Sequence, residues 1–370
     1  MTQPRKTIGL LFGGRSAEHE VSKLSAANVF RALDAERYDI VLIGIDRDGR
    51  WLLCDTGNGA GRGVRSLEIP VGAPQVALLP GGNGEMIVLG GKVSPGSLRL
   101  DAIIPVLHGP NGEDGTVQGL LQLANVPYVG SGVMGSAASM DKDVAKRLLR
   151  DSGIPVVPFL TLTERNQMDY QAAVDALGTT DLFVKPANMG SSVGVSRATS
   201  AGEFGQACER AFRYDGKLLV ERSITGAREI ECSVLEDASG EVSASLLGEI
   251  MPASSHGFYS YDAKYIDADG ALLRIPAELS AEQARKIQDL AIETFKVLSC
   301  EGLARVDFFV DPNREKTLFV NEVNTLPGFT AISMYPKLWE AGGLSQRELM
   351  EVLLGHAFAR HERRNGLALV

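Results

Sequence analysis

The pattern of apolar and polar positions predicts a strand–helix–strand unit at the start of the chain. An apolar run at 8–12 ends at the Gly13–Gly14 turn, and a second apolar run covers 38–45. Between them, apolar residues recur at helical spacing from Val21 to Leu33, with Ser16 as the expected N-cap and acidic residues in the first turn. This order of elements is typical of a parallel α/β sheet.

The remainder of the chain predicts mixed strands and helices. Residues 54–98 are rich in glycine, and we expect a loop-rich insertion with a hairpin or two. Further strands are expected at 101–107, 182–186, 218–221, 229–235, 245–249, 303–310 and 317–323. Helices are expected around 140–146 and over 280–299 and 345–360, followed by a frayed polar tail at 361–370.

Composition and charge exclude several classes of function. The 370-residue chain has a net charge of -9 and a pI near 5.2, so it lacks the basic footprint of a nucleic-acid-binding protein and is a poor partner for anionic membranes. Its 4 cysteines form no CxxC pair, which argues against a zinc site or a disulfide framework. With no signal-peptide core and no stretch of membrane-spanning length, we expect a soluble cytoplasmic protein.

The segment 302–324 predicts a hairpin that carries a metal site. Two β-rich runs flank a turn-rich segment, and a turn centred between Arg314 and Glu315 would place Arg305 opposite Asn324 and Asp307 opposite Glu322. Facing carboxylates repel unless a positive charge lies between them. A hard cation such as Mg²⁺ fits the oxygen ligands of Asp307, Glu322 and Asn324. The alternative is the solvated face of an ordinary hairpin.

A second segment predicts a phosphate-binding loop. Lys185 ends an apolar strand and precedes a loop in which Gly190 and Gly194 let the backbone approach an anion, while Ser191 and Ser192 add donors. The segment is not a Walker loop, because no GxxxxGK[ST] pattern occurs. A plain surface loop of this composition is the alternative.

Three other features of the sequence are weaker evidence for a binding site. Residues 130–135 match GxGxxG but do not follow the first strand, so we reject a nicotinamide- or flavin-binding interpretation. Lys142 and Lys146 lie one turn apart on a predicted helix, where an exposed basic face is plausible for Lys146. His108 follows a strand at the edge where ligands gather, although a lone histidine is more often structural.

Taken together, these segments resemble the D-alanine–D-alanine ligases of the ATP-grasp superfamily, over most of the chain. The resemblance rests on segments 11–22, 107–119, 127–134, 140–142, 184–186, 190–194, 258–265, 305–307 and 321–328. It implies a three-domain ATP-grasp architecture of α/β and α+β class, with an N-terminal Rossmann-like parallel-sheet domain at 1–131. A central subdomain at 132–222 and a C-terminal subdomain with the metal site at 223–370 would hold the nucleotide between them.

The resemblance also implies the nucleotide and metal ligands. Two Mg²⁺ ions, for which Mn²⁺ can substitute, would lie on Asp307, Glu322 and Asn324. The implied ATP-binding residues are Lys142, Phe183, Lys185, Ser192, Glu221, Ile224, Glu229 and Lys264. The segment between Glu221 and Glu229 is about one residue longer than in many relatives, which leaves Glu231 as the alternative ribose ligand. The role of the glycine-rich insertion is left open.

For the substrates, the resemblance implies that Glu18 and His108 hold the first D-alanine. Arg305, Gly328 and Ser333 would contact substrate carboxylates and the developing oxyanion. Glu18, Ser191 and Tyr265 would form a hydrogen-bonded set that positions substrate, and residues 256–265, with Gly257 as a hinge, would form a lid.

The implied activity is the ATP-dependent joining of two D-alanines through an acyl phosphate, for peptidoglycan precursors. The family also implies a homodimer, with small molecules as its substrates and no nucleic acid or membrane as a partner. One rival is a sister ligase that prefers D-lactate, against which Tyr265 argues because it adds no positive charge. A second rival is a nucleotide-binding regulator that has lost catalysis. A third is an ATP-grasp synthetase for larger peptides or purine precursors.

Overall fold

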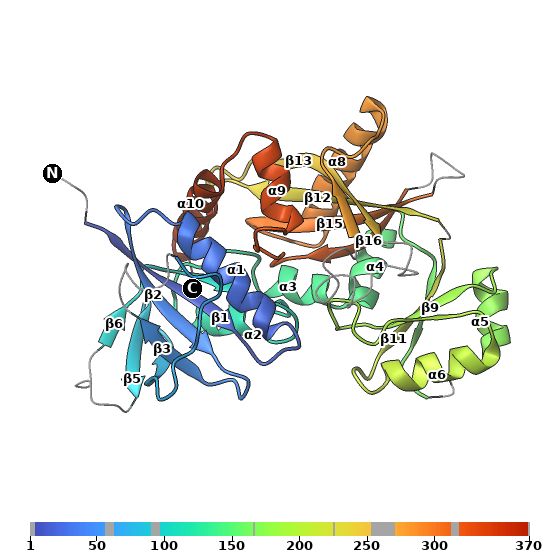
Figure 1. Ribbon diagram of the computed structural model, residues 1–370, viewed down its shortest axis with the longest axis horizontal. Helices are drawn as coiled ribbons and strands as arrows, with labels where there is room; N and C mark the ends of the chain where they lie inside the picture. The colour runs from blue at the N-terminus through green and yellow to red at the C-terminus, as the bar shows by residue number, and fades with distance from the viewer. Residues whose placement is uncertain are drawn as a thin grey trace.

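The protein is built on three β-sheets, with helices packed around them (Figure 1). The computed structural model describes residues 4–55, 63–89, 97–165, 167–224, 226–252, 271–311 and 318–368. In Figure 1 the first sheet is blue to cyan, the second lies among the yellow-green helices, and the third runs from yellow to red. The predicted α/β and α+β class is confirmed.

The N-terminal sheet has 7 strands in the order β6-β5-β4-β3-β2-β1-β7. They are β1 (Lys6–Gly13), β2 (Tyr38–Ile45), β3 (Trp51–Asp55), β4 (Gln75–Leu78), β5 (Glu85–Leu89), β6 (Ser97–Arg99) and β7 (Ala102–Val106). β1 is parallel to both β2 and β7, and α1 (His19–Ala32) connects the first two, which confirms the predicted unit. The described part of the glycine-rich insertion extends the sheet with the antiparallel pairs β4–β5 and β5–β6.

Helices cover both faces of this sheet. On one face α1 and α10 (Gln346–Asn365) share a core in which Phe12, Phe30 and Leu353 are buried. On the other face lies α2 (Thr116–Leu123). The predicted fraying of 361–370 is wrong for the residues up to 365, because α10 continues to Asn365. The buried Arg360 also anchors it by donating to the Tyr128 carbonyl at 2.7 Å.

The central sheet is antiparallel and has the order β10-β9-β11-β8. Its strands are β8 (Phe159–Leu162), β9 (Leu182–Pro186), β10 (Ser196–Ala198) and β11 (Leu218–Arg222). On one face Val184 and Val220 pack with α5 (Tyr170–Leu177) and α6 (Ala201–Ala211). Because side chains alternate along a strand, Lys185 and Glu221 face the other way. The sheet therefore turns a charged face toward the rest of the protein.

The C-terminal sheet is also antiparallel, in the order β14-β13-β12-β15-β16. Its strands are β12 (Arg228–Glu236), β13 (Val242–Pro252), β14 (Ala271–Arg274), β15 (Leu303–Val310) and β16 (Leu318–Asn324). α8 (Ala281–Val297) covers one face, and α9 (Met334–Ala341) packs against β12 and β13. α3 (Val133–Met140) and α4 (Lys142–Asp151) lie between the N-terminal sheet and the other two sheets (Figure 1).

Candidate functional site

The hairpin of β15 and β16 has the predicted register at its polar end. Arg305 lies opposite Asn324, and Asp307 lies opposite Glu322. Beyond Asp307 the pairing shifts by one residue, so that Phe308 lies opposite Val320. This irregularity allows Val320 and Val323 both to face the core although they are three positions apart. The bulge thus keeps the apolar side chains of β16 packed against α8. The predicted ligands lie on the opposite, polar face of the hairpin.

On the polar face, Arg305 neutralises two carboxylates. Its Nε and NH2 donate to the Asp307 oxygens at 2.7 and 2.8 Å, and its Nε lies 3.1 Å from Glu231 Oε2. Burial opposes a charged guanidinium, but Asp307 and Glu231 raise the pKa of Arg305 well above its usual value. Arg305 therefore remains a cation inside the protein.

The same face fits a hard cation. Asp307, Glu322 and Asn324 offer carboxylate and amide oxygens, the donors that Mg²⁺ prefers. Across the described part of the chain, no cluster of three His, Cys, Asp or Glu side chains is placed to hold a metal. An ion here would thus need the Asn324 amide and ligand phosphates to complete its coordination, and Arg305 would have to share Asp307 with it.

A cavity of about 430 Å³ joins this face to residues from elsewhere in the chain. The predicted residues that line it are Glu18, His108, Ser191, Arg305, Glu322, Asn324, Gly328 and Ser333. They come from the start of α1, the end of β7, the loop after β9 and the hairpin with its following loop. Positions predicted separately in the sequence therefore meet around one cavity.

The start of α1 differs from the prediction. Ser16 is not the N-cap, because the helix begins at His19 and Glu18 occupies the cap position. The Ser16 hydroxyl instead accepts a hydrogen bond from the Glu18 amide, at 3.1 Å, in the turn before the helix. The Glu18 carboxylate accepts a hydrogen bond from Ser191 Oγ, and Ser191 and Ser192 have left-handed backbone angles of 51° and 59°. The predicted Glu18–Ser191 pairing is thus confirmed, and it ties the start of α1 to the loop after β9.

His108 is held from both sides of its ring. Its Nδ1 lies 3.0 Å from the Leu326 carbonyl, so Nδ1 carries the proton, and its Nε2 lies 3.2 Å from Ser25 Oγ. Burial lowers the pKa of His108, with Glu18 opposing this, which favours the neutral ring. The histidine lines the cavity, but a substrate could bond to it only by replacing one of these two partners.

Glu113 is a site residue that the sequence analysis missed. It lines the cavity, and its carboxyl accepts a hydrogen bond from the Gly109 amide, at 2.6 Å. Burial, and then the charge of Glu18, raise the pKa of Glu113 to about 8. Its place in the polar turn after β7, next to His108, was the one available signal, because ligands gather at that edge of an open sheet.

The predicted lysines meet between the central and C-terminal sheets. Lys142 Nζ donates to the Met189 carbonyl at 2.7 Å and lies 3.7 Å from Glu322. Lys185 Nζ lies 2.6 Å from Glu221 Oε2 and 3.5 Å from Asn321 Oδ1. Both lysines are therefore next to the hairpin that carries the predicted metal ligands.

The interpretation of Lys146 as part of an exposed basic face is wrong. This side chain is buried, and its Nζ forms a 2.9 Å ion pair with Glu221 Oε1. Glu221 is therefore bridged by two lysines, and they lower its pKa although burial would raise it. Burial lowers the pKa of Lys146 to about 8, against the attraction of Glu221.

The other described residues that are predicted to contact the nucleotide lie on several elements around the same two sheets. Phe183 lies on β9 opposite Glu221, and Glu229 lies on β12 two positions before Glu231, on the same face. Ser192 is in the loop between β9 and β10, and Ile224 follows β11. Lys264 and Tyr265, and with them the predicted lid at 256–265, lie outside the described residues.

The GxGxxG segment has a structural use. Its Gly132 is the N-cap of α3, and the Gly132 amide donates to the Glu301 carboxylate at 3.0 Å. Arg360 NH1 lies 3.2 Å from the same carboxylate. The anion at this helix start is thus a side chain of the protein.

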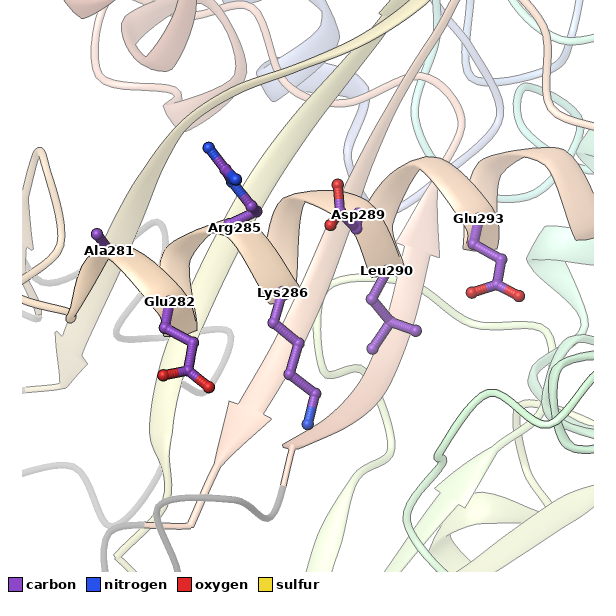
Figure 2. Close-up of a pocket in the computed structure, with 7 residues that line it drawn as sticks. All are labelled: Ala281, Glu282, Arg285, Lys286, Asp289, Leu290 and Glu293. Carbon is purple, nitrogen blue, oxygen red and sulfur yellow. The ribbon is translucent and has the colours of Figure 1, made fainter.

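A larger hollow of about 660 Å³ runs along the exposed side of α8 (Figure 2). Its lining comes from that helix alone, and charges of both signs lie along it between Glu282 and Glu293. It contains no residue of the predicted site. The cavity at the β15–β16 hairpin is therefore the candidate functional site.

Comparisons with known proteins find relatives over nearly the whole chain. A family model described as D-ala D-ala ligase N-terminus matches residues 7–131, and one described as D-ala D-ala ligase C-terminus matches residues 148–355. D-alanine--D-alanine ligase B of Bradyrhizobium diazoefficiens is 63% identical over 370 residues, which is 100% of this chain and 98% of that protein. A D-alanine--D-alanine ligase of a Methylobacterium species is 59% identical over 360 residues, covering 97% and 93% of the two chains.

Solved structures show the same likeness. The D-alanine-D-alanine ligase from Coxiella burnetii has a TM-score of 0.84 and 39% identity, and the match covers 98% of this chain and 96% of that one. The VanG D-Ala:D-Ser ligase from Enterococcus faecalis has a TM-score of 0.83 and 34% identity, and the match covers 96% of this chain and 100% of that one.

Among the described residues, every helix is too short or too polar to cross a lipid bilayer.

The raised pKa of Glu113 predicts a pH-dependent stability. The folded chain favours the protonated carboxyl, so its contribution is fully present below about pH 4.5 and is lost as the pH rises toward 8. Glu113→Gln keeps a neutral group of the same shape. As the pH rises from 5 to 9, we expect the unfolding free energy of the variant to increase relative to that of the wild type, by on the order of 3 kcal/mol. Denaturant unfolding at each pH is the measurement, and the exposed Glu164→Gln is the control. Curves of unfolding free energy against pH that run parallel for Glu113→Gln and the wild type would contradict the prediction.

Proposed function

The chain belongs to the D-alanine–D-alanine ligase family, and from this premise we propose how its cavity joins two D-alanines. The reaction is the ATP-dependent formation of D-alanyl-D-alanine, which supplies peptidoglycan synthesis. One observation carries the assignment of residues. Glu18 and Ser191, from distant parts of the chain, line the same cavity as Arg305, Glu322 and Asn324.

The proposed chemistry has two steps. The carboxylate of the first D-alanine attacks the γ-phosphorus of ATP, giving an acyl phosphate and ADP. The amine of the second D-alanine then attacks the acyl carbon, loses a proton, and phosphate leaves. Such transfers depend on positioning and charge neutralisation more than on covalent chemistry by the protein. A cavity lined by an arginine and bordered by lysines suits that need.

Asp307, Glu322 and Asn324 are proposed to hold Mg²⁺, as two ions for which Mn²⁺ can substitute. Bound there, the metal would supply charge neutralisation at the ATP phosphates. Arg305 stands beside these ligands and remains charged, so it can stabilise the oxyanion that forms during amine attack. Gly328 and Ser333, which line the same cavity, would contact the substrate carboxylate.

Glu18 and His108 are proposed to receive the first D-alanine. The Glu18 carboxylate suits the ammonium group, and Ser191 fixes its orientation. Neutral His108 would act through its place in the cavity wall, because both ring nitrogens already have protein partners. Tyr265 completes the proposed Glu18–Ser191 set, and residues 256–265 are the proposed lid that keeps water from the acyl phosphate.

The nucleotide is proposed to lie between the central and C-terminal sheets. Lys142, Lys185 and Lys264 would reach its phosphates, with Ser192 in the loop beside them. Phe183 would contact the adenine, whose edge Glu221 and Ile224 would recognise, and Glu229 would bind the ribose. The three sheets support the proposed domains at 1–131, 132–222 and 223–370. We place the enzyme in the cytoplasm, where ATP is available.

We propose that the protein is a homodimer and that α2 and α3 form the contact. Leu120, Leu123, Val133 and Met134 are between 39% and 71% exposed on these two helices. The start of α2 lies against α3, since a Cβ on Gly115 would be 2.9 Å from the Val133 carbonyl. Residues 116–140 contain no charged side chain. Two copies, each with net charge -9, repel least where such an uncharged apolar patch meets its equivalent.

The activity is tested by coupled ADP release with D-alanine as the amino acid substrate. We expect ADP and D-alanyl-D-alanine in equal amounts, and no turnover with L-alanine. Mixtures with D-lactate or D-serine separate the sister activities, the second because a structural relative is a D-Ala:D-Ser ligase. Turnover only in a mixture would reject D-alanine as the second substrate.

Glu322→Gln should lower kcat at least 100-fold and leave the fold intact, because the amide loses the charge needed to hold a divalent cation. Exposed Glu340→Gln is the matched control. Steady-state rates across a Mg²⁺ titration and the thermal midpoint are the measurements. Near-normal turnover at saturating Mg²⁺ would remove Glu322 from the metal site.

Leu123→Glu should convert the dimer to a monomer, because it places a like charge on each copy at the α2–α3 patch. Val71→Glu makes the same change in charge at a fully exposed position and should leave the dimer unchanged. Light scattering after size-exclusion chromatography gives the mass. A wild-type monomer, or a dimer that survives Leu123→Glu, would contradict the proposed contact.

A further inference from the structure

Lys146, Glu221 and Lys185 form a buried chain of three charges. Lys146 Nζ lies 2.9 Å from Glu221 Oε1, and Lys185 Nζ lies 2.6 Å from Glu221 Oε2. The three residues are 1%, 3% and 9% exposed. They come from α4, β11 and β9, so their relative positions are fixed by packed elements. Two cations thus share one carboxylate, one on each oxygen.

The two lysines have different positions relative to the cleft. Lys185 also donates to Asn321 Oδ1 on β16 of the hairpin, at 3.5 Å. Lys146 pairs with the other oxygen of Glu221, and its Nζ lies 5.8 Å from the Phe159 ring centroid on β8. Among the described residues its ion-pair contact is Glu221. Of the two lysines, Lys185 is the one with a hydrogen bond to the hairpin, so a phosphate group bound there would draw on Lys185.

Lys185 cannot serve a phosphate without weakening its pair with Glu221. A buried carboxylate that loses its only cation is strongly destabilised, whereas one that keeps a cation is not. Resting on the function proposed above, we infer that Lys146 is a positioning residue for the nucleotide. It keeps Glu221 paired, and so releases Lys185 to the phosphates of ATP.

Removing the charge of Lys146 should therefore weaken nucleotide binding through Lys185. In Lys146→Met, Lys185 is the one ion-pair partner that Glu221 keeps among the described residues, so Glu221 withholds it from the ligand. ADP with Mg²⁺ should bind at least tenfold more weakly, whereas adenosine, which has no phosphate, should bind within threefold of the wild type. The KM for ATP should rise, and the KM for D-alanine should change less than twofold.

The test is isothermal titration calorimetry with ADP and Mg²⁺ on the full chain. Because Lys146 acts by keeping Glu221 paired, the double variant Lys146→Met/Glu221→Gln should bind ADP within threefold of Glu221→Gln alone, since the neutral amide does not withhold Lys185. Lys146→Arg, which keeps a cation, should return the affinity to within threefold of the wild type. Exposed Lys296→Met is the control for the loss of one positive charge. If the methionine variant does not fold, Lys146→Gln provides the same comparison.

Multiplicative losses in the double variant would overturn the inference, as would equal weakening of adenosine and ADP, since both indicate a structural role. Unchanged ADP affinity in Lys146→Met would overturn it while leaving the proposed function intact. A wild-type chain that binds no ADP at all would overturn both.

Discussion

The ion pairs of Arg305 are the constraint on which the candidate site depends. β12, β15 and β16 lie side by side, and their polar faces bring Glu231, Asp307 and Glu322 together. Without a cation among them these carboxylates would repel, and the site would favour protonation or unfolding. Arg305 meets this need with a charge that does not titrate in the working range. The apolar side of the same strands can then pack against α8 without strain from the polar side.

Charge compensation recurs where the central sheet faces this hairpin. Glu221 is balanced by two lysines, and Lys142 lies near Glu322. The acidic chain thus gathers buried cations at one location, where an anionic ligand can replace protein carboxylates as their partner. Buried ion pairs add little net stability by comparison with apolar packing. Their concentration around one cavity is better explained by binding than by folding.

The sequence predicted what depends on local pattern and missed what depends on neighbours in space. The hairpin register was predictable because strand periodicity and one turn define it, but the bulge after Asp307 reflects how Val320 and Val323 must both reach α8. Lys146 could not be recognised as buried, because its burial comes from β11. Glu113 was missed because a lone acid in a polar turn looks solvated until the cavity encloses it. The predicted lid at 256–265 stays a prediction.

The packing of α10 against α1 has a consequence for how the chain folds during synthesis. Phe12 and Phe30 share their core with Leu353 and Leu354, which are synthesised long after them. The N-terminal sheet therefore cannot complete its core until α10 has left the ribosome, and its apolar face must remain exposed or chaperoned in the meantime. A contact between distant parts of the sequence also forms slowly, because a long loop must close. A chain that stops before α10 would therefore leave the core of its N-terminal sheet uncovered on one face, although that sheet is built from earlier residues.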